Sequence, residues 1–292
     1  MKSIYVYVII LWGDIFLNQQ FLLHKDTAVY YTSPLLDTYS VPHAFFTRHG
    51  GVSAPPFDTL NFAVGTGENR DDAQSVLLNH RIAASVFGLD ETSVCRTYQT
   101  HSTTVLLADE NDRGRGTVLP PYDCDVDGLV TVCEELILSV RSADCVPILL
   151  YDVKNDICGA VHSGWRGTQG NISGVAIEKM CALGSDKKDI IAAIGPCAGV
   201  CCYEVGAELY HIFTDINKDY SKYFVPKENS KYFLDLTGLN TAVLINNGID
   251  DNRISACNIC TCCNTKDFFS HRVMGKERGT MASFIMNRRK AK

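Results

Sequence analysis

The sequence predicts a mixed α/β protein, because strand-like apolar runs fill the middle of the chain and segments with helical spacing flank them. The chain has 292 residues, of which 46% are hydrophobic and 21% charged, as in ordinary globular proteins. Its formal net charge of −6 lacks the basic surface of a general nucleic-acid binder, so we expect no nucleic-acid partner. A small anionic substrate bound by a few local arginines stays compatible with this charge.

The predicted helices share apolar side chains that recur every three or four residues. They cover residues 71–88, 174–183, 205–213 and 234–245, and Asn247-Gly248 after the last one is typical of a helix end. The predicted strands are short apolar runs over residues 105–107, 128–132, 136–140, 146–151, 158–161 and 190–194.

Residues 1–30 are predicted to form an N-terminal extension, and residues 31–292 a single domain. The apolar run from Ile4 to Trp12 is shorter than the roughly 20 residues that cross a bilayer. No small-residue cleavage site follows it closely, so a weak signal-like segment and an over-extended start both stay open. We expect a cytoplasmic protein with no membrane partner, and the sequence does not predict its oligomeric state.

The chain contains 13 cysteines, an odd number that leaves at least one thiol unpaired within the chain. A chain of this length builds a core without disulfides, unlike small disulfide-stapled proteins. This favours a reducing compartment in which most cysteines act as small buried hydrophobic residues.

Three candidate metal ligands lie at the ends of predicted strands, namely His101, Cys145 and His162. Two imidazoles and one thiolate form a reasonable open zinc set, since catalytic zinc usually keeps three protein ligands. The same residues also suit a nucleophile pair, with Cys145 as thiolate and either histidine as base. A structural role for each residue is a third alternative, and spacing alone does not separate the three.

Seven motifs in order carry a resemblance to a known family. They are Phe46-Thr47-Arg48-His49-Gly50-Gly51-Val52-Ser53, Gln99-Thr100-His101-Ser102, Asp125-Val126-Asp127-Gly128-Leu129-Val130-Thr131, Ala143-Asp144-Cys145-Val146-Pro147, His162-Ser163-Gly164-Trp165-Arg166-Gly167, Gly195-Pro196-Cys197 followed by Cys201-Cys202-Tyr203-Glu204-Val205-Gly206, and Phe268-Phe269-Ser270-His271-Arg272. From about Val41 to Arg288 the chain closely resembles the YfiH/YlmD family of laccase-domain proteins, which are described as purine nucleoside phosphorylases.

The resemblance implies a layered α/β/β/α sandwich with mixed sheets, as in the cysteine-hydrolase superfamily, and one zinc ion bound by the three candidate ligands. It also implies purine nucleosides and phosphate as partners: phosphorolysis of adenosine, inosine, guanosine and methylthioadenosine, with adenosine deamination as a side activity. Copper-dependent polyphenol oxidation has been assigned to the same family, which makes Cu²⁺ an alternative ion. The chain has 8 histidines, too few for a four-copper oxidase.

Within the matching motifs, Arg48, Arg166 and Arg272 are candidate phosphate ligands, because the planar guanidinium matches phosphate oxygens. Arg48 ranks first, since Gly50-Gly51 beside it could supply backbone N–H groups to an anion. A structural salt bridge is the alternative for each.

Aromatic and acidic residues complete the candidate site. Tyr98 and Trp165 flank the ligand histidines and would stack on a purine, or else belong to the core. Asp144 and Asp127 are candidates to orient a ligand histidine, to shuttle a proton or to cap a turn. Neither ligand histidine is followed by the glutamate of known zinc deaminases.

Two further features stay open. Many relatives read Gly-Arg-Met-Ala near the C-terminus where this chain has Arg278-Gly279-Thr280-Met281-Ala282, which puts the role of that arginine in doubt. A second thiol group, Cys257, Cys260, Cys262 and Cys263, together with Cys197, Cys201 and Cys202, allows a second metal, a redox cluster or buried thiols. The resemblance favours buried thiols.

The leading hypothesis is therefore a zinc-dependent purine nucleoside phosphorylase. The alternatives are a hydrolase that uses Cys145 as nucleophile on an amide or peptidoglycan-related substrate, and a non-enzymatic metal-binding or partner-binding module.

Overall fold

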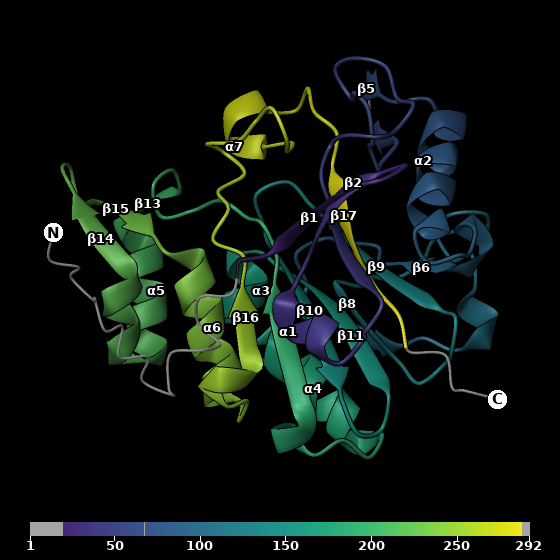
Figure 1. Cartoon of the computed structure of the whole chain (residues 1–292). Coiled ribbons are helices and arrows are strands. Elements are labelled where there is room, and N and C mark those ends of the chain that lie inside the picture. Colours follow the sequence, from purple (N-terminus) through teal and green to yellow (C-terminus); the bar gives the residue numbers. More distant parts are fainter. Residues whose placement is uncertain (1–19, 67, 288–292) are drawn as a thin grey trace, which may run out of the picture.

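The structure is a computed structural model that describes residues 20–66 and 68–287 (Figure 1). The apolar run from Ile4 to Trp12 lies outside the described residues. Within them, no helix is both long enough and apolar enough to cross a membrane.

The first large sheet has six strands in the order β1-β2-β3-β17-β9-β6. Its strands are β1 (Leu22–Lys25), β2 (Val29–Thr32), β3 (His43–Phe46), β6 (Val94–Arg96), β9 (Ile137–Ser142) and β17 (Met281–Ile285). β6 runs parallel to β9, whereas the other neighbours pair antiparallel. Residues 22–30, which we expected in an N-terminal extension, thus supply β1 and the start of β2.

The second large sheet also has six strands, in the order β16-β12-β10-β11-β8-β7. Its strands are β7 (Val105–Leu107), β8 (Gly128–Thr131), β10 (Val146–Asp152), β11 (Ile157–Ser163), β12 (Ile190–Ile194) and β16 (Ile254–Ala256). The β12–β16 and β7–β8 pairs are parallel and the other pairs antiparallel. Both sheets are therefore mixed, as expected.

The other strands form two smaller sheets, and seven helices lie outside the sheets of the described residues. The remaining strands are β4 (Gly65–Thr66), β5 (Asn69–Arg70), β13 (Glu204–Gly206), β14 (Phe224–Lys227) and β15 (Lys231–Leu234). The helices are α1 (Pro34–Thr38), α2 (Ala73–Ser85), α3 (Trp165–Gln169), α4 (Ile172–Ala182), α5 (Ala207–Ile216), α6 (Leu236–Asn246) and α7 (His271–Met274).

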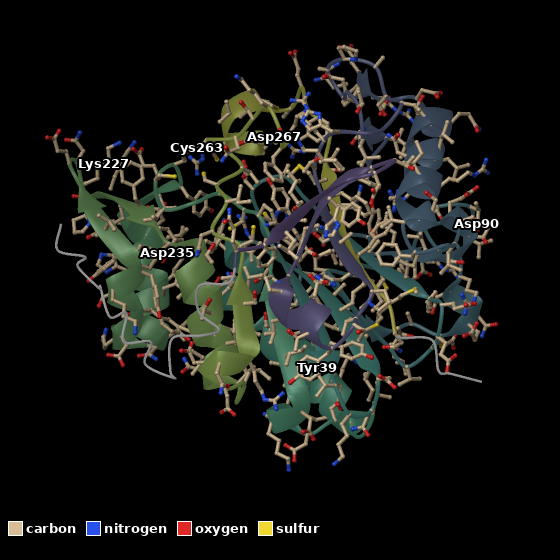
Figure 2. The ribbon with its side chains drawn as sticks, in the orientation of Figure 1. Tyr39, Asp90, Lys227, Asp235, Cys263 and Asp267 are labelled. Atoms are coloured by element: carbon tan, nitrogen blue, oxygen red, sulfur yellow. The ribbon has the colours of Figure 1, made fainter. Side chains whose placement is uncertain are left out.

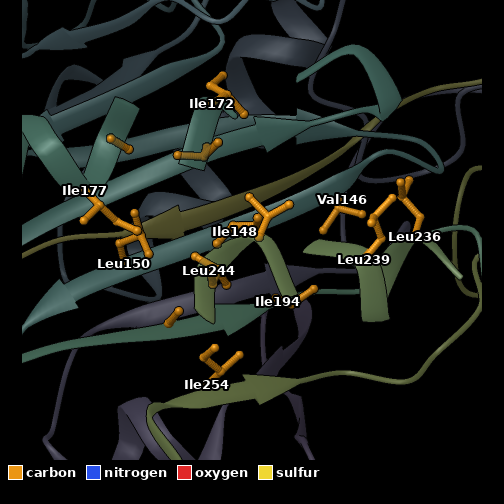
Figure 3. Close-up of a cluster of buried hydrophobic side chains, with 14 of the residues drawn as sticks. Val146, Ile148, Leu150, Ile172, Ile177, Ile194, Leu236, Leu239, Leu244 and Ile254 are labelled. Atoms are coloured by element: carbon orange, nitrogen blue, oxygen red, sulfur yellow. The ribbon is translucent and has the colours of Figure 1, made fainter. Parts of the chain in front are cut away.

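The three largest apolar clusters of the described residues build the core in layers. One cluster joins Phe45 and Val140 of the first sheet to Leu149 and Ile191 of the second, so these faces of the two sheets pack together. A larger cluster covers the other face of the second sheet, where Ile148 and Leu150 pack against α4 and α6 (Figure 3). A third cluster joins α2 to Phe46 and Phe284 of the first sheet.

The predicted elements are confirmed with two kinds of difference. Helices α2, α4 and α6 and strands β7 to β12 fall where periodicity places them. The helix expected over 205–213 begins later, because residues 204–206 form β13, and it extends to Ile216. Strands β1 to β6 and β13 to β17, and the short helices α1, α3 and α7, were not predicted. The four-residue β3 begins with His43 and so lacks the longer apolar run that marks β10 and β12.

Candidate active site

The antiparallel β10–β11 pair brings Cys145 and His162 together. Cys145 directly precedes β10, and His162 lies opposite Pro147 near the end of β11. His101 comes from the loop between β6 and β7, where its backbone φ of +68° is left-handed. Such a φ is uncommon for a residue other than glycine, and it marks a constrained loop.

The three side chains converge as predicted. Cys145 Sγ lies 3.7 Å from His101 Nε2, and the rings of His101 and His162 are 5.0 Å apart in an edge-on contact. One ligand atom from each of the three lies within 4.8 Å of the others. Zinc bonds of about 2.0–2.3 Å in a tetrahedron separate ligand atoms by roughly 3.3–3.8 Å, so this donor set fits one ion with a free fourth position.

Asp127 supports two of the three ligands from a fully buried position, with 0% of its surface exposed. His162 Nδ1 donates a 2.8 Å hydrogen bond to its carboxylate, which directs Nε2 toward Cys145 and His101. The backbone N–H groups of Thr100, His101 and Ser102 donate to the same carboxylate at 2.8–3.1 Å. Asp127 therefore orients His162, a candidate metal ligand, and caps the turn that carries His101.

The charges of these groups reinforce one another. Burial alone would raise the pKa of Asp127, but His162 and the surrounding donors lower it to about 2. Burial would lower the pKa of His162, but the neighbouring Cys145 and Asp127 raise it to about 9. Burial would raise the pKa of Cys145, but the two histidines lower it to about 6. Cys145 is thus poised as a thiolate, which both a metal ligand and a nucleophile require.

Asp144 has a different task from Asp127. Its carboxylate accepts hydrogen bonds from Thr261 Oγ1 at 2.7 Å, from Ser270 Oγ at 3.0 Å and from the backbone N–H of Arg272 at 2.6 Å. These donors occupy the carboxylate, so Asp144 ties the segment from Thr261 to Arg272 to the strand end beside Cys145. These contacts suit a positioning role, and the catalytic role expected for Asp144 stays a prediction, since Asp144 also lines the cavity described next.

A cavity of about 520 Å³ is lined in part by His101 and Cys145. We call it the aromatic lobe; it is lined by His101, Ala143, Asp144, Cys145, Trp165, Arg166, Tyr203, Leu236, His271 and Arg272. The guanidinium of Arg166 lies 4.2 Å above the Trp165 ring, and that of Arg272 lies 5.1 Å above Tyr203. Trp165, Arg166 and Arg272 were predicted, whereas Tyr203 was quoted within a motif without a role.

A second cavity of about 380 Å³ shares His101, Ala143, Cys145 and His271 with the first. We call it the arginine lobe; it is lined by Gln99, His101, Arg141, Ser142, Ala143, Cys145, His162, His271, Arg278 and Thr280. Arg141 and Arg278 both line it, and their Nε atoms are buried without a hydrogen-bond partner among the described residues. Burial, and then the positive charges of Arg96 and Arg278, lower the pKa of Arg141 to about 9. The lobe is therefore a concentrated positive site beside the ligands.

Two predicted substrate residues are not at the cleft. Arg48 is 13% exposed, and its donors bind Asp58 O at 2.8 Å, Asp58 Oδ1 at 3.0 Å and Thr265 O at 3.0 Å. The N–H of Gly51, expected to face an anion, donates to Thr59 Oγ1 at 3.1 Å. Tyr98 is 47% exposed, and it lines neither lobe. The expected role of Arg48 as a phosphate ligand is corrected, because oxygen atoms of Asp58 and Thr265 already accept the hydrogen bonds of its guanidinium group.

The fold and the cleft define a class of α/β proteins in which strand ends and a neighbouring loop present a His, Cys, His set beside two adjoining cavities. Residues 42–288 match the family described as "Multi-copper polyphenol oxidoreductase laccase". The chain belongs to this family, whose members include the YfiH and YlmD proteins.

Three similar proteins illustrate the family. The chain is 34% identical over 248 residues to "Purine nucleoside phosphorylase" of Deinococcus radiodurans, covering 84% of this chain and 89% of that protein. It is 34% identical over 241 residues to "Adenosine deaminase RL5" of an unknown prokaryotic organism, covering 81% and 90%. The crystal structure of Bacillus licheniformis YfiH superposes with a TM-score of 0.83 at 30% identity, covering 91% of this chain and 99% of that one.

Proposed function

We propose that the protein is a zinc-dependent purine nucleoside phosphorylase with adenosine deamination as a side activity. Its substrates would be phosphate and a purine nucleoside: adenosine, inosine, guanosine or methylthioadenosine. One observation carries the proposal: an aromatic lobe and an arginine lobe share His101 and Cys145 in their linings, and His162, which completes the three-residue set, lines the arginine lobe. The relatives named purine nucleoside phosphorylase and adenosine deaminase support it.

The arginine lobe suits the phosphate. Phosphorolysis breaks the bond between purine N9 and ribose C1′ while a phosphate oxygen bonds to C1′. Arg141 and Arg278 bring two guanidinium groups with unsatisfied buried Nε atoms into this lobe. Because a planar guanidinium pairs with phosphate oxygens, a bound phosphate would satisfy these donors and offset the repulsion between the two cations.

The aromatic lobe suits the purine. Trp165 and Tyr203 offer flat apolar faces, and Leu236 adds an aliphatic wall. Arg166 and Arg272 already lie over these rings, so the lobe combines aromatic area with positive charge. Positive charge at this position would stabilise the electron density that the departing purine gains.

His101, Cys145 and His162 would hold the zinc ion where the two lobes meet. When bound, zinc supplies a Lewis acid that polarises an oxygen or ring nitrogen of the substrate. Asp127 keeps His162 in the required tautomer and keeps the His101 loop in place. The same donors also bind Cu²⁺, yet two imidazoles are far fewer than a multicopper centre uses. The cytoplasm suits a site that needs a free Cys145 thiolate.

The test is to incubate the zinc-loaded protein with inosine, with and without phosphate. We expect hypoxanthine and ribose-1-phosphate only when phosphate is present. If hypoxanthine and free ribose form at equal rates with and without phosphate, the reaction is hydrolysis and not phosphorolysis. If none of the four nucleosides gives a product, the proposal is wrong. Adenosine without phosphate tests the side activity, with inosine as the expected product.

A second candidate rests on a different feature of the same residues. Cys145, His162 and Asp127 line up as thiolate, imidazole and carboxylate, the order used by cysteine hydrolases. The alternative is a hydrolase of amide or peptidoglycan-related substrates, and a wider kinship with cysteine hydrolases stays a prediction. A covalent adduct on Cys145 during turnover, seen by mass spectrometry in the presence of a chelator, would favour it.

A further inference from the structure

Seven cysteines near the aromatic lobe divide into two groups. Cys197, Cys257 and Cys262 are buried, as the resemblance led us to expect. Cys201 and Cys263 are exposed, and Cys202 and Cys260 are partly exposed. The second group, which we call the four-thiol cluster, lines neither lobe of the cleft.

The four sulfur atoms converge although their residues come from two distant segments. All four Sγ atoms lie within 4.8 Å of one another, with Cys202–Cys263 at 3.3 Å and Cys201–Cys263 at 3.4 Å. Four Zn–S bonds of about 2.3 Å in a tetrahedron separate the sulfurs by roughly 3.8 Å. A disulfide would instead place one pair at about 2.05 Å. The spacing therefore suits a shared ion better than a covalent pair.

The backbone holds the two segments together independently of the thiols. Cys197 and Cys260 form a parallel β-bridge, and Thr261 N–H donates to Cys197 O at 2.9 Å. Gly199 N–H donates to Cys260 Sγ at 3.2 Å, a contact that stabilises a thiolate ligand. A Cβ atom on Gly199 would lie 3.3 Å from the sulfurs of both Cys201 and Cys260, so glycine leaves room for their approach.

The position of the cluster also favours a structural role. Figure 2 labels Cys263 near the molecular edge, between α7 and the β13–β15 strands. Thiols at the surface exchange protons and ions with solvent readily. Four protein ligands complete a tetrahedron, which is the pattern of closed structural zinc sites.

We propose that Cys201, Cys202, Cys260 and Cys263 form a second zinc site, closed and structural, that no described activity uses. On binding, the four thiols release their protons to solvent and the four thiolates each form one bond to the ion.

The site would brace one wall of the aromatic lobe. Cys202 directly precedes Tyr203, which lines that lobe. Thr261, between Cys260 and Cys263, donates to Asp144, the residue next to Cys145. An ion in the four-thiol cluster would thus fix Tyr203 and Asp144 without touching a substrate.

Metal counting after zinc loading and gel filtration tests the proposal without any activity assay. We expect two zinc ions per chain in the wild type and one in Cys263→Ser. Cys145→Ala should also hold one, from the loss of the other site. Cys124→Ser is the matched control, because Cys124 is an exposed free thiol outside both groups, and it should keep two.

A spectrum keeps the test decisive if Cys263→Ser fails to fold. Cys145→Ala loaded with Co²⁺ should show the intense sulfur-to-cobalt charge transfer of a four-thiolate tetrahedral site. Two results would overturn the proposal. One is a Cys145→Ala variant that binds no metal. The other is a native mass of the wild type that contains no zinc at the cluster and is lower by two hydrogens for each disulfide formed between its thiols.

Discussion

The His101–Cys145–His162 set and the four-thiol cluster differ in what surrounds their ligands. The first lies at strand ends and an adjoining loop, is buttressed by the buried Asp127, and lines two cavities. The second lies on two loops, lines neither cavity, and is held by backbone contacts. Three ligands beside a cleft leave a position for chemistry, whereas four ligands leave none. In the two zinc sites that we propose, the number of ligands and the groups around them, more than the ligand type, distinguish the reactive site from the structural one.

The largest effect that would break this comparison is expected from Cys145→Ala. We expect kcat for phosphorolysis of inosine to fall by about a thousandfold or more, since the variant removes a ligand and the thiolate together. Cys263→Ser, which alters only the four-thiol cluster, should keep activity within about tenfold of wild type. If steady-state assays show the same fall in kcat for both variants, both clusters take part in the reaction.

A smaller effect is expected in the arginine lobe. Arg141→Gln should raise KM for phosphate by about ten- to a hundredfold, because one charged hydrogen bond contributes about 1.5–3 kcal/mol. The KM for inosine should change little. Arg166→Gln, in the aromatic lobe, is the matched control. Its KM for inosine should rise, and its KM for phosphate should change little. An unchanged KM for phosphate in Arg141→Gln would remove the lobe from phosphate binding.

The role of Asp127 sharpens the contrast between the two sites. Asp127→Asn keeps the size of the side chain but loses the charge that holds His162. We expect zinc affinity at the active site to fall about ten- to a hundredfold, as for other carboxylates behind a ligand histidine. Competition with a fluorescent chelator in the Cys263→Ser background measures this site alone. Wild-type affinity there would show that the carboxylate only caps the turn.

The smallest effect concerns a buried imidazole that belongs to neither site. His80 packs against Phe62 and Phe284, and burial first, then the charges of Arg96 and Arg141, lower its pKa well below the usual value. His80 therefore stays neutral in the folded state, whereas the unfolded chain takes up a proton below about pH 6.5. Neutral His80 therefore contributes to the free energy of unfolding above that pH, and this contribution is lost as the pH falls.

Urea unfolding at several pH values measures this loss. Between about pH 7 and pH 5 the wild type should lose up to about 2 kcal/mol from this residue, and His80→Leu should lose correspondingly less. His43, which is also buried with a lowered pKa, keeps its own pH dependence in both proteins. An identical pH dependence in wild type and variant would contradict the assignment.

The elements that sequence reasoning found are those with local signals. Helical spacing marked α2, α4 and α6, and motif order marked His101, Cys145 and His162. Strand β17 was missed because Ser283 interrupts its five residues, so they do not form a continuous apolar run like that of β12, and its neighbours β3 and β9 lie far away in the chain.

The arginines show the same limit at the level of the site. Arg48 lay in a promising glycine-rich motif, but Asp58 and Thr265 take its donors, and no local pattern reveals such partners. Arg141 sits within β9, outside the quoted motifs, and reaches the cleft only through the packing of the two sheets. Arg278 was quoted with its role in doubt, yet it lines the cleft.

Anomalous diffraction from crystals grown with zinc and measured at the zinc edge tests the central claim most directly. We expect a peak about 2.3 Å from Cys145 Sγ and about 2.0–2.1 Å from one ring nitrogen each of His101 and His162, facing the junction of the two lobes. Crystals in which these three side chains keep their positions but share no peak would contradict the account.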